Sequence, residues 1–168
     1  TLQGPKMLTS VPGPKAKALL EEKKAYTSDC ITIGAPTIVE RGEGALMEDV
    51  DGNVFLDFVG GIGVLNIGYS NPEVVKAVQD QAAKFFHTAY NVVLYKGYID
   101  LCEKIAEILP GPSKKKVMLI NAGTEAIENA VKIARLATGK SGVICFEGAF
   151  HGRTYMALSL TSKVKYKH

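Results

Sequence analysis

Two short segments of the chain carry residue types that could bind an anionic ligand. The first is the turn Asn121-Ala122-Gly123-Thr124, which lies between an apolar run at residues 117–120 and an amphipathic stretch. A strand that turns into a helix leaves backbone N–H groups unpaired at the helix start, where the helix dipole favours an anion. Gly123 allows the backbone to approach the anion closely, and Thr124 adds a hydroxyl. The turn therefore predicts a phosphate site, although by spacing alone a helix start that binds nothing is equally expected.

The second segment is Phe150-His151-Gly152-Arg153-Thr154, which follows another apolar run at residues 143–146. It offers an aromatic ring, an imidazole and a guanidinium at the end of a predicted strand, where the ligands of open α/β sheets collect. A guanidinium fork binds a carboxylate in two places. From the residues alone, a core position for Phe150 and a surface ion pair for Arg153 are the more common roles. The sequence contains neither a dinucleotide-binding nor a P-loop glycine motif.

Alternating strand and helix patterns surround these two segments. From residue 117 to residue 146 the order is strand, glycine-threonine turn, helix and strand, which indicates a predominantly parallel sheet covered by helices. Upstream, Asn71-Pro72 starts a helix with a polar cap, and Pro110-Gly111-Pro112 ends another. The remaining expected elements are β-type segments at residues 37–40, 45–49 and 54–58, and helices at residues 16–25, 97–109 and 125–138.

Several other segments carry weaker expectations. Residues 1–15, rich in proline and glycine, predict an extended arm that lies across a partner. Residues 59–66 are too rich in glycine for a stable helix interior, and they fit a loop close to a ligand or a domain crossover equally well. His87 is expected to be structural, and Cys145 to be a small buried residue.

The sequence Gly-Thr-Glu-Ala-Ile-Glu-Asn-Ala-Val-Lys-Ile-Ala-Arg, which starts at Gly123, and Phe-His-Gly-Arg-Thr, which starts at Phe150, resemble class III aminotransferases that use pyridoxal phosphate. The resemblance is strongest to the members that act on 4-aminobutyrate. It implies a truncated α/β fold of the type I pyridoxal phosphate transferases. Residues 1–66 would be the N-terminal arm and small-domain segment, and residues 67–168 the first, incomplete part of the large, mostly parallel-sheet domain that binds the cofactor. It also implies a homodimer.

The resemblance assigns roles to individual residues. Gly123 and Thr124 match positions that hold the cofactor phosphate, Phe150 matches the residue that stacks on the pyridine ring, and His151 lies next to the cofactor. Arg153 matches the arginine that binds the substrate carboxylate, and Ile62 a residue that lines the substrate pocket. No metal is expected. The family's lysine that carries the cofactor as a Schiff base lies beyond His168, so no catalytic residue is assigned in this chain.

The expected reaction of the parent enzyme is transfer of an amino group from 4-aminobutyrate to 2-oxoglutarate, which gives succinate semialdehyde and glutamate. Two alternatives remain open: another class III ω-aminotransferase, acting on ornithine, acetylornithine or a different ω-amino acid, and an inactive truncated fragment. By itself the chain is expected to be inactive, with the remainder of the same enzyme as its partner.

Composition and charge exclude several other classes of protein. Of the 168 residues, 46% are hydrophobic and 22% charged, which is ordinary for a globular protein. Twenty basic and 17 acidic residues give a formal net charge of +3, too small to indicate nucleic-acid binding. Cys30, Cys102 and Cys145 are widely spaced and predict free thiols. Neither a signal peptide nor a membrane-length apolar run is visible, so a cytoplasmic location is expected.

Overall fold

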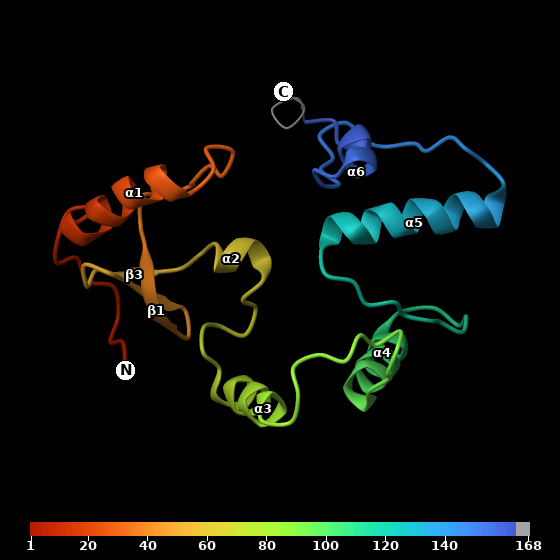
Figure 1. Cartoon of the computed structure of the whole chain (residues 1–168), viewed down its shortest axis with the longest axis horizontal. Coiled ribbons are helices and arrows are strands. Elements are labelled where there is room, and N and C mark those ends of the chain that lie inside the picture. The colour runs from red at the N-terminus through yellow and green to blue at the C-terminus, as the bar shows by residue number, and fades with distance from the viewer. Residues whose placement is uncertain (164–168) are drawn as a thin grey trace. The chain divides into compact units, whose positions relative to one another are not determined.

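The computed structural model describes residues 1–163 and divides the chain into two compact units, one from Thr1 to His87 and one from Thr88 onward (Figure 1). The expected boundary between a small-domain segment and a cofactor domain near Asn66 concerns the complete enzyme and stays a prediction.

The first unit is built around a small antiparallel sheet in the order β1-β2-β3. Gly52, in the turn between β2 and β3, has a φ of +85°, a conformation that glycine adopts without strain. Asn71 caps the third helix by accepting hydrogen bonds from the N–H groups of Glu73 and Val74, as the sequence predicts. The elements are α1 (Pro14–Tyr26), β1 (Val39–Glu43), β2 (Leu46–Asp49), β3 (Val54–Leu56), α2 (Gly60–Gly63) and α3 (Pro72–Ala82).

The N-terminal arm is bound to the sheet of its own chain. Lys6 forms an isolated antiparallel bridge with Val54. The fully buried side chain of Asn53 accepts hydrogen bonds at Oδ1 from the N–H groups of Leu8 and Thr9, both at 2.8 Å. Its Nδ2 donates to Thr9 Oγ1 and to Asp49 Oδ2. One buried amide thus connects the arm to the β2–β3 hairpin.

The second unit contains α4 (Lys96–Ile108), α5 (Gly123–Thr138) and α6 (Tyr155–Leu160). The predicted helices over residues 97–109 and 125–138 are confirmed, and α5 ends at Gly139, whose φ of +68° closes the helix in the left-handed conformation. Tyr98 of α4 accepts a hydrogen bond from the N–H of Leu119 at 2.8 Å, and its ring stacks on Tyr90 at 3.8 Å between centroids.

The two predicted strands at residues 117–120 and 143–146 are wrong for this structure. The mostly parallel sheet, which belongs to the large domain of the complete enzyme, stays a prediction. Both segments lie outside regular secondary structure, and the sheet that the structure describes is antiparallel throughout. Residues 117–120 keep the alternating burial of a strand, with Val117 and Leu119 half-buried and their neighbours exposed. A strand needs a hydrogen-bonded neighbour, and residues 1–163 supply none to either segment.

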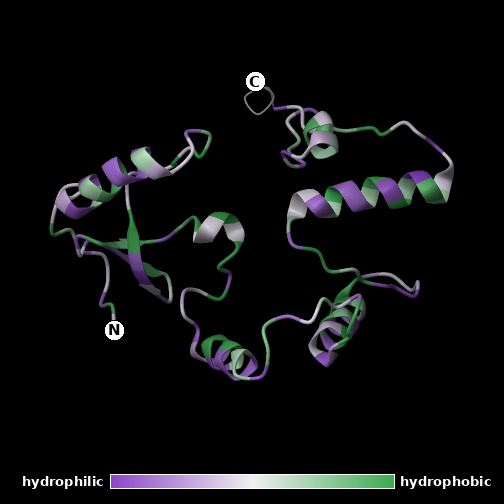
Figure 2. Ribbon diagram, in the orientation of Figure 1, coloured by the Kyte–Doolittle hydropathy of each residue, from purple (hydrophilic) through white to green (hydrophobic). Residues whose placement is uncertain are grey.

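The hydrophobic core of the described residues is small. Its buried apolar members are Ala16, Val54, Val131 and Ala157. Figure 2 shows hydrophobic and hydrophilic residues side by side along α5, as its amphipathic sequence predicts, although only Val131 of that helix is buried. Cys145 is exposed, contrary to expectation, because residues 143–146 are not enclosed in a sheet; all three cysteines are free thiols. No helix within residues 1–163 has the length and apolar character needed to span a membrane.

Candidate functional site

The start of α5 presents unpaired backbone donors. Ala122, the N-cap residue, is extended and makes no side-chain capping bond, and the carboxylate of Glu125 in the first turn accepts its hydrogen bond from the N–H of Asn121, before the helix. The first N–H groups of the helix are therefore available at the positive end of its dipole. A Cβ built on Gly123 would meet no protein atom within 4 Å. Packing does not require glycine at this position, so the open space next to the backbone is free for a ligand atom.

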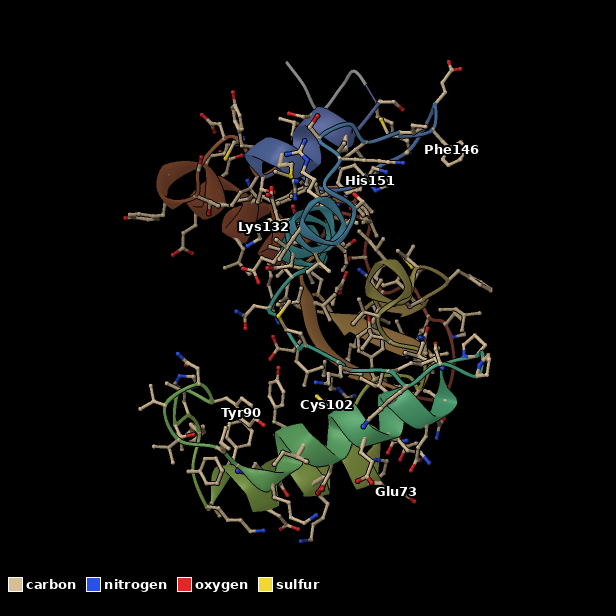
Figure 3. The ribbon with its side chains drawn as sticks, turned by 90° about the vertical axis from the view of Figure 1, so that its right-hand side faces the viewer. Glu73, Tyr90, Cys102, Lys132, Phe146 and His151 are labelled. Atoms are coloured by element: carbon tan, nitrogen blue, oxygen red, sulfur yellow. The ribbon has the colours of Figure 1, made fainter. Side chains whose placement is uncertain are left out.

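A pocket of about 620 Å³ lies at the start of α5. We call it the α5–loop pocket, because Gly123, Thr124 and Ile127 line it from the helix and residues 150–154 line it from the loop before α6. The structure thus brings together five residues that the sequence assigned to one site: Gly123, Thr124, Phe150, His151 and Arg153. Figure 3 shows His151 on the loop beside α5, whereas Phe146 projects outward and is 80% exposed.

Gly152 lets the loop pack directly on α5. Its φ is +135°, and an added Cβ would lie 2.2 Å from Thr124 Oγ1 and 3.0 Å from the Cβ of Ala157. Residues with a side chain rarely adopt this φ, and the contact with Thr124 leaves no space for a side chain. The close contact fixes the loop against the first turn of α5, and with it the neighbouring His151 and Arg153.

Thr161 secures the same loop from the other side. Its fully buried hydroxyl accepts a hydrogen bond from the N–H of His151 at 3.0 Å and lies within donating distance of the carbonyl oxygens of Gly152 and Ala157. The N–H of Ser162 donates to the carbonyl of Ala149. Loop and α6 therefore form one hydrogen-bonded piece.

Glu128 joins α5 to this piece. Its Oε1 accepts hydrogen bonds from Thr154 Oγ1 at 2.5 Å and from the N–H groups of Met156 and Ala157, both at 3.1 Å. These hydrogen bonds hold the pKa of the Glu128 carboxyl below its usual value. The bond from Thr154 has the largest effect, and the bond from Ala157 also lowers the pKa. Lys132 lies four residues further along α5, but it forms no ion pair with Glu128 within residues 1–163, because the carboxylate is turned toward α6.

The guanidinium of Arg153 is exposed, and among the described residues no carboxylate lies within ion-pair distance of it. The surface ion pair that the sequence also allowed is therefore not formed within this part of the chain. Phe150, at 49% exposure, lies on the pocket wall and not in a core.

Ile62 belongs to the first unit, so the structure does not place it relative to the pocket. It is 90% exposed and has a φ of +62° and a ψ of +52°, a left-handed conformation that is rare for a β-branched residue. The carboxylate of Asp57 accepts hydrogen bonds from the N–H groups of Val59 and Gly60, and Tyr69 donates its hydroxyl to the same carboxylate at 2.7 Å. These contacts hold the start of the strained segment.

Comparison with known proteins identifies the family. The model of the class III aminotransferases matches residues 32–168. The chain belongs to the class III aminotransferases. It is 48% identical over 148 residues to a 5-aminovalerate aminotransferase of Pseudomonas aeruginosa, and this match covers 88% of the chain and 35% of that protein. It is 44% identical over 161 residues to a 4-aminobutyrate aminotransferase of Mycobacterium tuberculosis, covering 96% of the chain and 36% of that protein.

Solved aminotransferases share the fold of this part of the chain. An ω-transaminase of Pseudomonas jessenii in complex with PMP superimposes with a TM-score of 0.78 at 28% identity, covering 88% of the chain and 35% of that structure. An ω-transaminase of Sphaerobacter thermophilus gives a TM-score of 0.75 at 32% identity, covering 84% and 32%. The chain spans about a third of the length of the relatives and solved structures that it matches.

Members of this family use pyridoxal phosphate. The α5–loop pocket has a donor set that fits such a group: unpaired backbone N–H groups at the helix start, space beside Gly123, an aromatic ring and a free guanidinium.

Sequence reasoning missed Glu128, Thr154 and Thr161, which hold this pocket together. The spacing of Thr124 and Glu128, one helical turn apart, was the available signal, since it places both on one face of α5.

Proposed function

We propose that this chain provides the phosphate, ring and carboxylate contacts of an aminotransferase that transfers the amino group of 4-aminobutyrate to 2-oxoglutarate. The observation that carries the proposal is the α5–loop pocket, which places Arg153 next to the start of α5. The remainder of an enzyme of the relatives' length would complete the site and supply the lysine that holds the cofactor. We extend the proposal to a homodimer, as the family resemblance implies.

Each residue has a defined task in this proposal. The backbone N–H groups of Gly123 and Thr124 bind the cofactor phosphate, and Phe150 stacks on the ring and leaves its other face to the substrate. The bound cofactor supplies the electron sink for amino-group transfer. Arg153 binds the substrate carboxylate in two places and so directs the distal amino group toward the ring. His151 lies at the pocket wall beside these groups.

A second candidate substrate is 5-aminovalerate. The 48% identity to a 5-aminovalerate aminotransferase supports it. The two amino acids differ by one methylene, which changes binding in a hydrophobic pocket by only about 1–3 kcal/mol. Arg153 would bind the carboxylate of either one, and Ile62, if it lines the pocket, would contact the chain between the two ends.

Amine-donor profiling of the full-length enzyme that carries this chain tests the proposal. We expect turnover of 4-aminobutyrate with 2-oxoglutarate, and we expect Arg153→Lys to raise KM for the amino acid about tenfold, because a lysine cannot form the two-point contact. The matched control is Arg135→Lys on the exposed part of α5, which should leave KM unchanged. Turnover of ornithine or acetylornithine without turnover of 4-aminobutyrate would overturn the choice of substrate.

A further inference from the structure

The loop that carries Phe150 and Arg153 has no regular secondary structure, so its position relative to α5 depends on side-chain contacts. One side chain of α5 is bonded both to the end of this loop and to the start of α6. Glu128 Oε1 accepts hydrogen bonds from the hydroxyl of Thr154 and from two N–H groups in the first turn of α6. Thr154, the N-cap residue of α6, makes no capping bond itself. The cap of α6 therefore comes from the neighbouring helix, and it fixes the end of the loop next to Arg153.

The directions of the hydrogen bonds extend this connection to the pocket wall. An ionised carboxylate only accepts, so Thr154 donates its single hydroxyl hydrogen to Glu128. Its oxygen must then accept the hydrogen bond from Thr124 Oγ1, which lies at 2.8 Å. The result is a directed chain from Thr124 through Thr154 to Glu128.

The geometry leaves little freedom between these residues. Gly152 lies against Thr124, with no room for a Cβ, and Thr154 is bonded to both Thr124 and Glu128. Arg153 lies between Gly152 and Thr154 in the sequence. Its backbone is thus fixed on both sides by contacts to α5, while its guanidinium remains exposed.

We propose that Glu128 is a positioning residue for the carboxylate contact of this site: through Thr154 and the start of α6 it sets the distance between the phosphate end of the pocket and Arg153. This inference rests on the proposed function. Glu128 touches neither cofactor nor substrate in this assignment, and it acts through the loop. Its removal should therefore weaken binding of the substrate carboxylate more than binding of the cofactor, whose phosphate is held by α5 itself.

The test uses the full-length holoenzyme with the variants Glu128→Ala, Glu128→Gln and Thr154→Val. The measured quantities are KM and kcat for 4-aminobutyrate, the inhibition constant of butyrate as a carboxylate without an amine, and the absorbance of the bound cofactor. For Glu128→Ala we expect KM and the butyrate inhibition constant to rise about tenfold, with cofactor occupancy retained and a smaller change in kcat. Glu128→Gln, whose amide oxygen still accepts hydrogen bonds, should recover most of this loss.

The control is Lys132→Ala on the same helix, which removes the nearby positive charge but no hydrogen bond of Glu128, and it should leave all four quantities unchanged. The double variant Glu128→Ala/Thr154→Val should be no worse than Glu128→Ala alone, because both changes break the same connection. Additive effects, an unchanged butyrate constant in Glu128→Ala, or an equal loss in Lys132→Ala would overturn the proposal. If Glu128→Ala does not fold, Thr154→Val decides in its place, because it breaks the same connection. A wild-type enzyme that turns over no ω-amino acid would refute the proposed function instead.

Discussion

Two glycines of the α5–loop pocket have different reasons to be glycine. Gly152 has a φ of +135° and lies so close to Thr124 that no side chain fits. Gly123 has open space around the position of a Cβ, so the fold itself would accept a larger residue there. Packing requires glycine at position 152 but not at position 123, where the proposed function provides a reason: a bound cofactor would approach the backbone.

Alanine substitutions should separate these two roles. Gly152→Ala should lower the free energy of unfolding by about 2–3 kcal/mol, because it combines backbone strain with an overlap against Thr124. Gly123→Ala should change that free energy by no more than about 1 kcal/mol and raise the cofactor dissociation constant about tenfold. Urea unfolding and titration of the cofactor absorbance measure the two effects. Equal destabilisation by both variants would contradict the distinction.

At the scale of elements, α2 depends on a polar anchor at its start. Asp57 accepts hydrogen bonds from Tyr69, Val59 and Gly60, and the bond from the Tyr69 hydroxyl is the main cause that lowers the pKa of the Asp57 carboxyl. The same bond, with burial, raises the pKa of the Tyr69 hydroxyl. The segment that contains Ile62 is thus held by a pair of groups whose charge states depend on pH.

Tyr69→Phe should therefore destabilise the protein in a pH-dependent way. A lowered pKa of Asp57 stabilises the fold above the unfolded value of about 3.9, and this contribution is lost as pH falls through the lower folded value. The raised pKa of Tyr69 stabilises the fold below its unfolded value of about 10, and this contribution is lost at higher pH. The difference in melting temperature between wild type and variant should be largest near neutral pH and shrink toward both extremes. Tyr26→Phe, at a residue that is 86% exposed, is the control that should show no such profile.

Elements with local signals could be predicted from the sequence, and those that need distant neighbours could not. The start of α3 follows from the Asn71 cap and the end of α5 from Gly139, since both act within one turn of the helix. The segments 117–120 and 143–146 have strand-like composition, but a strand forms only when another segment pairs with it. Within the described residues, the N–H of Leu119 donates a hydrogen bond to the hydroxyl of Tyr98 and not to a neighbouring strand.

For the site too, short local motifs could be recognised in the sequence, whereas contacts between distant residues could not. That Gly123, Thr124, Phe150 and Arg153 lie at one pocket could be predicted, because their chemistry is visible in two short motifs. The role of Glu128 could not be predicted, since the sequence shows neighbours on a helix, such as Lys132, but not contacts across 26 residues, such as the one to Thr154. The role of Ile62 in lining the substrate pocket stays a prediction, because this residue lies in the other unit.

Long-range polar contacts also determine how each unit responds to mutation. Asn53 is fully buried and connects the β2–β3 hairpin to Leu8 and Thr9, more than 40 residues away in the sequence. Asn53→Ala would leave these N–H groups and Asp49 Oδ2 without their partner. We expect a loss of about 2–4 kcal/mol, since each unsatisfied buried group costs about 1–3 kcal/mol and water reaches some of them in the variant.

The effect should be confined to the first unit, because every hydrogen bond of Asn53 lies within it. Hydrogen exchange should therefore become faster at the amides of Leu8 and Thr9, and then across residues 1–87, while the amides of Leu119 and His151 in the second unit keep their protection. Asn66→Ala, at an exposed asparagine of the same unit, is the control that should leave exchange unchanged. Equal acceleration at Leu119 and His151 would mean that the two units unfold together, and that the contacts of Asn53 stabilise the pocket as well as the N-terminal arm.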